Sequence, residues 1–112
     1  MSAAPGPQPA PALIWCPFPD RESAILAANS LLDERLAACA NIMPDMLSLF
    51  VWQGERGEAK ETGVLLKTNA ALLEPAVARL AQLHPYAQPA IVGWHADAAN
   101  AGTAAWLGGL LP

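Results

Sequence analysis

The sequence predicts one small α+β domain in which two helices cover one face of a four-stranded sheet. Three observations predict it: four short runs with the apolar or alternating pattern of strands, two apolar stripes at helical spacing, and one long strand that is apolar on both faces. The chain has 112 residues, which suits a single domain. Apolar residues make up 54% of it and charged residues only 14%, so we expect part of the apolar surface to be buried between subunits.

Composition also indicates the cellular compartment and excludes some classes of binding partner. Residues 1–12 carry four prolines and no basic start, which predicts a disordered tail rather than a secretion signal and places the folded domain at residues 13–112. We therefore expect a cytoplasmic protein with two reduced cysteines. The net charge of −4 without a basic patch argues against nucleic-acid binding, and no apolar stretch is long enough to span a membrane.

The first two elements are a short strand and a long helix. An apolar run predicts a strand over 13–16, which Pro17 is expected to end. Asp20 is a suitable N-cap for a helix over 21–38, in which alanines and leucines recur every three or four residues.

The next stretch predicts a hairpin. Residues 41–52 alternate, and Pro44 near their start indicates a bulge or a sheet edge. The glycines and charges of 53–61 predict a solvated loop, and 62–68 form the return strand. A strand that covers one core is usually polar on its second side, but both sides of this one are apolar. One side carries Leu47, Leu49 and Val51, and the other carries Met46, Ser48, Phe50 and Trp52.

The last third supplies the remaining elements. Asn69 can cap a helix over 70–83, a strand is expected over 89–94, and an extra short C-terminal helix over 101–107. The resulting β-α-β-β-α-β order is that of the ferredoxin-like fold, a four-stranded antiparallel sheet with both main helices on one face. Its other face is bare, which agrees with the two-sided hairpin strand and predicts an oligomer.

Several short motifs, in a fixed order, carry a family resemblance. They include LAACANI at residues 36–42, Trp52 with Gly54, Lys67-Thr68, and His84-Pro85-Tyr86. The chain resembles CutA, the family of divalent-cation tolerance proteins, over about residues 13–107. The combination of LAAC, the hairpin Trp-x-Gly and HPY is specific, whereas each motif alone is weak.

The resemblance implies a function and an assembly. CutA proteins have the ferredoxin-like fold, form homotrimers through the long hairpin strands, and are linked to tolerance of copper and other divalent metals. Their fold and trimer also resemble the PII signalling proteins. The implied function is a metal-tolerance trimer that binds ions weakly; a PII-like sensor with an effector between subunits is the alternative, and a scaffolding trimer is a third reading.

Cys16 and His84 are the candidate metal ligands. A thiolate with an imidazole suits copper or zinc, but a closed structural site usually has four protein ligands. Some relatives carry a further histidine where Leu83 stands here, so a weak site or one shared between subunits is expected. The competing interpretation is a buried strand thiol at Cys16 and a histidine that closes a helix at residue 84.

The remaining singled-out residues are assigned to the subunit interface. Lys67, Glu61 and Tyr86 suit either an acid-base cluster or, as we prefer, a Lys–Glu pair with Tyr86 at the interface. Phe50 and Trp52 are interface residues because they lie on the second face of the hairpin strand.

Other chemistry-bearing residues have simpler explanations. Cys39 is interpreted as core packing at the end of the first helix, and His95 with Asp97 as a surface pair rather than a metal site. No glycine-rich phosphate loop and no nucleophile with a base in suitable context is present, so we expect no enzymatic activity.

Overall fold

The chain folds into one antiparallel sheet with two helices packed on the same side. A computed structural model describes residues 7–111; residues 1–6 of the predicted tail and residue 112 lie outside that range. The elements are β1 Pro11–Phe18, α1 Arg21–Asp33, β2 Cys39–Trp52, β3 Glu55–Asn69, α2 Leu73–Leu83, β4 Val92–His95 and α3 Ala101–Gly108.

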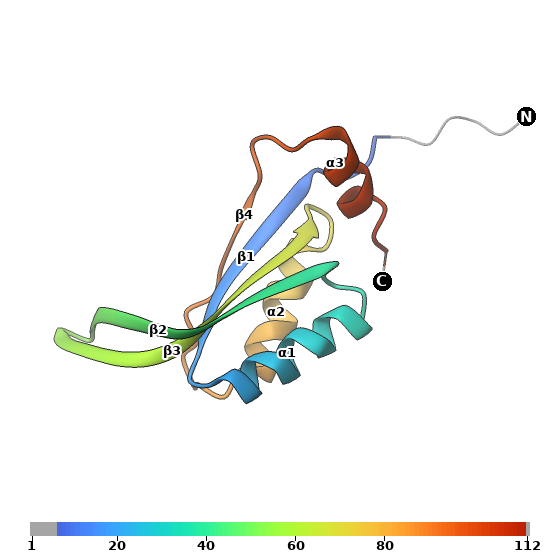
Figure 1. Cartoon of the computed structure of the whole chain (residues 1–112). Coiled ribbons are helices and arrows are strands. Elements are labelled where there is room, and N and C mark those ends of the chain that lie inside the picture. The colour runs from blue at the N-terminus through green and yellow to red at the C-terminus, as the bar shows by residue number, and fades with distance from the viewer. Residues whose placement is uncertain (1–6, 112) are drawn as a thin grey trace, which may run out of the picture.

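The strand order across the sheet is β2-β3-β1-β4, and every neighbouring pair is antiparallel. Helices α1 and α2 lie side by side on one face, and α3 packs at the end of the sheet where β1 begins (Figure 1). The predicted ferredoxin-like arrangement with helices on one face is therefore confirmed.

Alternation along β1 separates the two faces of the sheet. Ala12, Ile14, Cys16 and Phe18 are fully buried, whereas the residues between them are only partly buried. The buried set meets the alanine-rich inner side of α1 and the inner residues of α2, and together they form the core. The small alanine side chains let α1 lie close to the sheet, as the sequence pattern predicts.

Strand β1 is longer than expected at both ends. It begins at Pro11, so the last two residues of the predicted tail belong to the sheet, and Gln8 packs closely on Gly108 of α3. Pro17 does not end the strand, because β4 pairs only with residues 12–15. Among residues 7–111 no strand pairs with that side of β1 beyond Trp15, so a proline without an N–H donor is tolerated there.

Helix α1 ends at Asp33, five residues before the predicted end. The N–H of Leu36 donates to Leu31 O at 2.9 Å and that of Arg35 to Leu32 O at 3.1 Å, which is the hydrogen-bond pattern of a Schellman motif. Arg35 occupies its left-handed position with φ 59°. Glycine is the usual residue there, so the sequence carries no visible stop signal.

The hairpin differs most from expectation in its loop. Its turn is only Gln53 and Gly54, both with positive φ, and the predicted loop 53–61 is mostly strand β3. Two positive φ values define the tight turn that matches the twist of antiparallel strands. The predicted bulge is confirmed, because the register of β2 shifts between Met43 and Met46.

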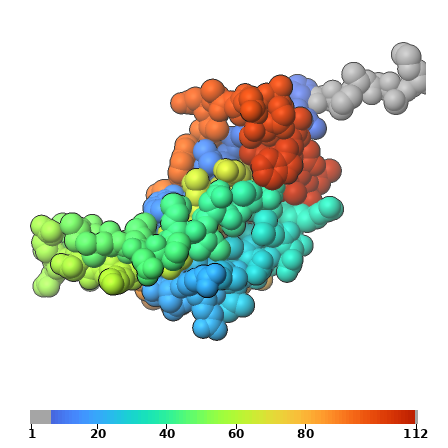
Figure 2. Space-filling model, in the orientation of Figure 1, coloured from blue at the N-terminus to red at the C-terminus, as the bar shows by residue number. Residues whose placement is uncertain are grey.

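The hairpin stands away from the body and makes the molecule elongated, with principal extents of 61 × 26 × 22 Å (Figure 2). Val51 is 67% exposed, Leu49 62% and Leu47 60% on one side, and Phe50 and Trp52 are exposed on the other. The predicted alternation is confirmed, and neither side of the distal hairpin has a core of its own to cover.

The C-terminal half follows the predicted order with shifted bounds. Residues 70–72 form a turn instead of the first turn of α2, which begins at Leu73. Oδ1 of Asn69 accepts from the N–H groups of Ala71 and Leu72, so Asn69 caps this turn. Strand β4 covers only Val92–His95, while α3 extends the predicted 101–107 by one residue.

Candidate functional site

His84 lies where α2, β1 and the following loop meet. It is only 7% exposed, and its ring stacks on Phe18 with centroids 4.2 Å apart. Nε2 lies 2.8 Å from the carbonyl oxygen of Pro17, and Nδ1 accepts from the N–H of Tyr86 at 3.1 Å. Because the carbonyl can only accept and the amide can only donate, the neutral tautomer with the proton on Nε2 satisfies both bonds.

Cys16 lies beside this histidine on the helix-covered face of β1. Its side chain is fully buried, and Sγ donates to the same Pro17 carbonyl at 3.6 Å. Burial, reinforced by the negative charge of Glu61, raises the pKa of the thiol from 9.0 to about 12. The thiol therefore keeps its proton at neutral pH.

The two predicted metal ligands are thus brought together around one backbone oxygen, and both hydrogen-bond to it. Among residues 7–111, no group of three or more His, Cys, Asp or Glu side chains is arranged to hold an ion. A protonated thiol and a ring whose nitrogens both have partners do not fit a tightly held ion within one chain. Metal ligation by Cys16 and His84 stays a prediction.

Tyr86 extends this cluster to the base of the hairpin. Its hydroxyl donates to Oε2 of Glu61 at 2.9 Å, and its ring lies 5.0 Å from that of His84. Partial burial, the hydrogen bond to Glu61, and the charges of Glu61 and Asp20 raise the pKa of Tyr86 to about 12. The contact joins the loop after α2 to strand β3, two segments 25 residues apart.

Lys67 lies away from this cluster, on the helix-free face of the sheet. Its cross-strand neighbours are Leu13 on β1 and Cys39 on β2. Lys67 and Glu61 belong to the same strand, six residues apart, so they are separated by about 20 Å and cannot pair within one chain. The structure therefore does not form the acid-base cluster considered from the sequence.

Phe50 and Trp52 lie on the same side of the hairpin as Met46, whose sulfur, like the ring of Trp15, would meet a Cβ placed on Gly63. This side continues the helix-free face of the sheet. The ring of Phe50 lies directly over Gly57, its cross-strand partner, where a Cβ would meet ring carbon Cε2 at 2.5 Å. The interface roles of Phe50, Trp52, Lys67 and Tyr86 stay predictions.

Two sequence interpretations concern residues outside this cluster. Cys39 is the first residue of β2 rather than the end of a helix, and it is only partly buried, with Sγ 3.7 Å from Oδ1 of Asn41. The core-packing interpretation of Cys39 was wrong, because α1 ends earlier than expected. His95 is exposed at the end of β4, in agreement with a surface histidine.

Two contributors to the site could not be identified from the sequence. The carbonyl of Pro17 is a backbone atom that any residue could supply. The stacking partner Phe18 was hidden because the first strand was expected to end before it. A longer first strand with alternating burial would have placed Phe18 beside the helix that precedes His84.

The fold and these motifs can be compared with known proteins. The sequence pattern of the CutA1 divalent ion tolerance protein matches residues 12–109. The chain belongs to the CutA1 family. This confirms the resemblance inferred from the LAAC, Trp-x-Gly and HPY motifs.

Individual CutA proteins agree in sequence and in structure. The divalent-cation tolerance protein CutA of Pyrococcus horikoshii is 40% identical over 95 residues, covering 85% of this chain and 92% of that protein. The CutA of Thermus thermophilus is 43% identical over 74 residues, covering 66% and 72%. The crystal structure of CutA1 from Ehrlichia chaffeensis superposes with a TM-score of 0.83 at 32% identity, covering 88% of this chain and 92% of that one.

The names of CutA relatives mention different cellular compartments. The Arabidopsis thaliana relative is named chloroplastic, and the Archaeoglobus fulgidus structure is described as periplasmic. Within residues 7–111 of this CutA chain, no helix has the length and apolar character required to cross a membrane.

Proposed function

We propose that this chain is a cytoplasmic, non-enzymatic homotrimer that acts in tolerance of divalent metals and binds copper or a similar ion weakly. Its membership in a family named for divalent ion tolerance supports the metal-related role. The observation that carries the choice of site is the convergence of Cys16 and His84 on the Pro17 carbonyl.

We expect weak metal binding because Cys16 would have to lose its proton and His84 one of its hydrogen bonds. Ligation needs a thiolate and a ring nitrogen with a free lone pair. The pKa of Cys16 is about 12, so the ion must displace a firmly held proton. At His84 the ion must replace either the Nε2 bond to Pro17 or the Nδ1 bond from Tyr86. Any further ligands come from solvent or from a neighbouring subunit.

We expect the site to bind copper more tightly than zinc because of the ligand atoms it offers. A single soft thiolate with one imidazole is a poor set for zinc, which takes four ligands in structural sites, whereas Cu(I) favours soft sulfur ligands. Because ligation releases protons, the affinity is expected to rise with pH.

Isothermal titration calorimetry with Cu(I), Cu(II) and Zn(II) tests the proposal. The wild type should bind copper weakly, and the Cys16→Ala, His84→Ala double variant should lose that binding. Cys39→Ala is the matched control because it removes the other, partly exposed thiol and should bind as the wild type does. Equal copper affinity in the wild type and the double variant would remove Cys16 and His84 as ligands.

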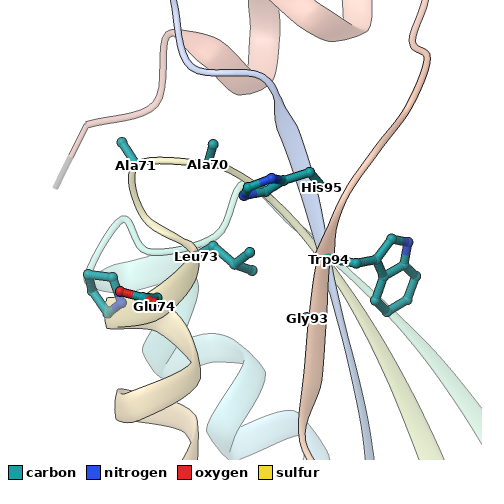
Figure 3. A pocket seen from close by; sticks show the side chains of 8 residues that line it. Ala70, Ala71, Leu73, Glu74, Gly93, Trp94 and His95 are labelled. Carbon is teal, nitrogen blue, oxygen red and sulfur yellow. The ribbon is translucent and has the colours of Figure 1, made fainter.

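A PII-like sensor is the second candidate, and one concave surface favours it. An open groove of about 550 Å³ lies between the start of α2 and β4. His95, Leu73 and Glu74 line it from two elements (Figure 3). The two-residue hairpin turn is far shorter than a signalling loop, which counts against this function. A thermal-shift screen of nucleotides and small metabolites in which none raises the melting temperature would argue against the sensor.

A further inference from the structure

Lys67 is a cation placed in an apolar row. Across the four strands, the register aligns Trp94, Leu13, Lys67 and Cys39, all on the helix-free face. The next row along the sheet carries Val92, Trp15, Leu65 and Asn41. Within residues 7–111 the one ion pair joins Arg79 to Glu34, so Lys67 has no carboxylate partner in its own chain.

Covering the helix-free face would bury the positive charge of Lys67. A second copy packed on the apolar rows would remove water from the Lys67 ammonium. A buried charge without a partner is strongly destabilising, so the covering surface has to supply an anion. The occupant of the face must therefore be apolar and must carry a carboxylate at a matching place.

The same chain carries such a carboxylate on the same face. Glu61 lies opposite Met46, and because side chains alternate along a strand, positions 61, 63 and 67 of β3 lie on the same side of the sheet. The Tyr86 hydroxyl donates to Oε2 and holds the carboxylate in place. Within residues 7–111 no hydrogen bond is made to Oε1, which leaves this oxygen able to accept another one.

We infer that in the assembled protein the Lys67 ammonium of one copy pairs with the Glu61 carboxylate of the next copy, and that this pair fixes the register between copies. The inference rests on the proposed homotrimer. A second copy of the chain is the favoured partner for the helix-free face, because that face carries both charges among apolar side chains. Glu61 is the first residue of β3 beyond its pairing with β1, which ends at Thr62, so a neighbour that packs against the base of the hairpin lies beside it.

A charge-reversal cycle read by sedimentation velocity tests the pair. Lys67→Glu and Glu61→Lys are each expected to raise the concentration at which half of the oligomer has dissociated by at least about tenfold, since both place like charges together. The double variant restores attraction with the charges exchanged, and it should return to within about threefold of the wild type.

Four further variants separate the effect of the pair from other effects. Arg21→Glu and Glu22→Lys make the same charge changes on the exposed side of α1 and should leave assembly unchanged. Tyr86→Phe removes the hydrogen bond to Glu61 without a charge change. It therefore measures how much of the Glu61→Lys effect on assembly comes from losing this hydrogen bond within one chain. Lys67→Met keeps the length of the side chain without its charge and should assemble better than Lys67→Glu.

The outcomes distinguish this inference from the proposed function. A trimeric wild type with an equally stable Lys67→Glu trimer would overturn the pair and leave the trimer intact; Lys67 would then be available to a small anion. Two weakened single variants without recovery in the double variant would also overturn it. A wild type that does not assemble would overturn both the trimer and the pair.

Discussion

At the scale of single residues, His84 is the connection between the core and the hairpin base. Its ring packs on Phe18, bonds to β1 through Pro17, and accepts from Tyr86, whose hydroxyl reaches Glu61. Both ring nitrogens are thereby engaged, so the role of His84 in the fold can be measured separately from any role in metal binding.

Replacing His84 by alanine is expected to lower the free energy of unfolding by about 2–4 kcal/mol. The change leaves the Pro17 carbonyl and the Tyr86 N–H without partners and opens a space beside Phe18. Urea unfolding followed by tryptophan fluorescence measures it. His95→Ala is the control, because that ring is exposed and its loss should cost less than about 0.5 kcal/mol. Equal effects in the two variants would contradict the contacts described for His84.

Cys16 makes the free energy of unfolding depend on pH at alkaline pH. The unfolded thiol ionises near pH 9, whereas the folded thiol keeps its proton up to about pH 12. Above pH 9 the unfolded state therefore binds fewer protons, and the free energy of unfolding falls as pH rises from about 9 towards 12. Below pH 9 this contribution is fully present.

Urea unfolding at pH 7 and pH 10 checks this dependence. The wild type should lose stability between these values, and Cys16→Ala should lose less. Cys39→Ala, which removes a thiol with no buried environment of this kind, should behave as the wild type does. Tyr86→Phe is a second control because the raised pKa of Tyr86 acts in the same direction from pH 10 upward. Identical losses in Cys16→Ala and wild type would contradict a buried, protonated thiol.

At the scale of elements, Asn69 joins three segments with one side chain. Oδ1 accepts from the turn before α2, while Nδ2 donates to Leu107 O at 2.8 Å and Leu110 O at 3.2 Å at the end of α3. The side chain is fully buried, so none of these groups can exchange its partner for water.

Asn69→Ala is therefore expected to loosen α3 selectively. Hydrogen-deuterium exchange should accelerate in residues 101–110 and in the turn 70–72, whereas the centre of the β1–β3 ladder should keep its protection. Asn100→Ala is a useful comparison, because it removes only the exposed cap at the start of α3. Uniform acceleration throughout the chain would show that Asn69 supports the whole fold rather than α3.

The tight hairpin turn gives a second element-scale prediction. Gly54 has φ +80° and Gln53 has φ 51°. Gly54→Ala should destabilise the protein by about 1 kcal/mol, because side chains disfavour this conformation. Gln53→Asn should be neutral or stabilising, since asparagine is preferred in such turns. Thermal unfolding of both variants measures the difference, and the opposite order of melting temperatures would contradict the turn geometry.

The elements could be predicted from the sequence wherever an apolar period extended over several residues. This was so for each strand and helix, for their order, and for the alternating faces of the hairpin strand. Element bounds could not be predicted where a local backbone conformation decided them. Arg35 ends α1 in a position that usually holds glycine, and the charges of the hairpin suggested a loop although they lie on exposed strand. At the site, the motifs selected Cys16 and His84, but the Pro17 carbonyl they share became visible only in three dimensions.

At the scale of the whole molecule, surface composition is the main feature to be explained. Large apolar side chains are exposed on both sides of the projecting hairpin and on the helix-free face, where Trp94 is 44% exposed. Isolated exposed apolar residues are common, but contiguous apolar surfaces of this kind usually mark an interaction site. The family membership and the two-sided strand both support other copies of the chain as the covering partners.

Sedimentation equilibrium of the full chain at low micromolar concentration measures whether copies of the chain cover these apolar surfaces. We expect a single species with the mass of three 11.7 kDa chains. Phe50→Glu with Trp52→Glu, which places charges on the helix-free side of the hairpin, should shift that species towards monomer. A wild type that sediments as a stable 11.7 kDa monomer over the whole concentration range would rule out self-assembly as the reason for the exposed apolar surface.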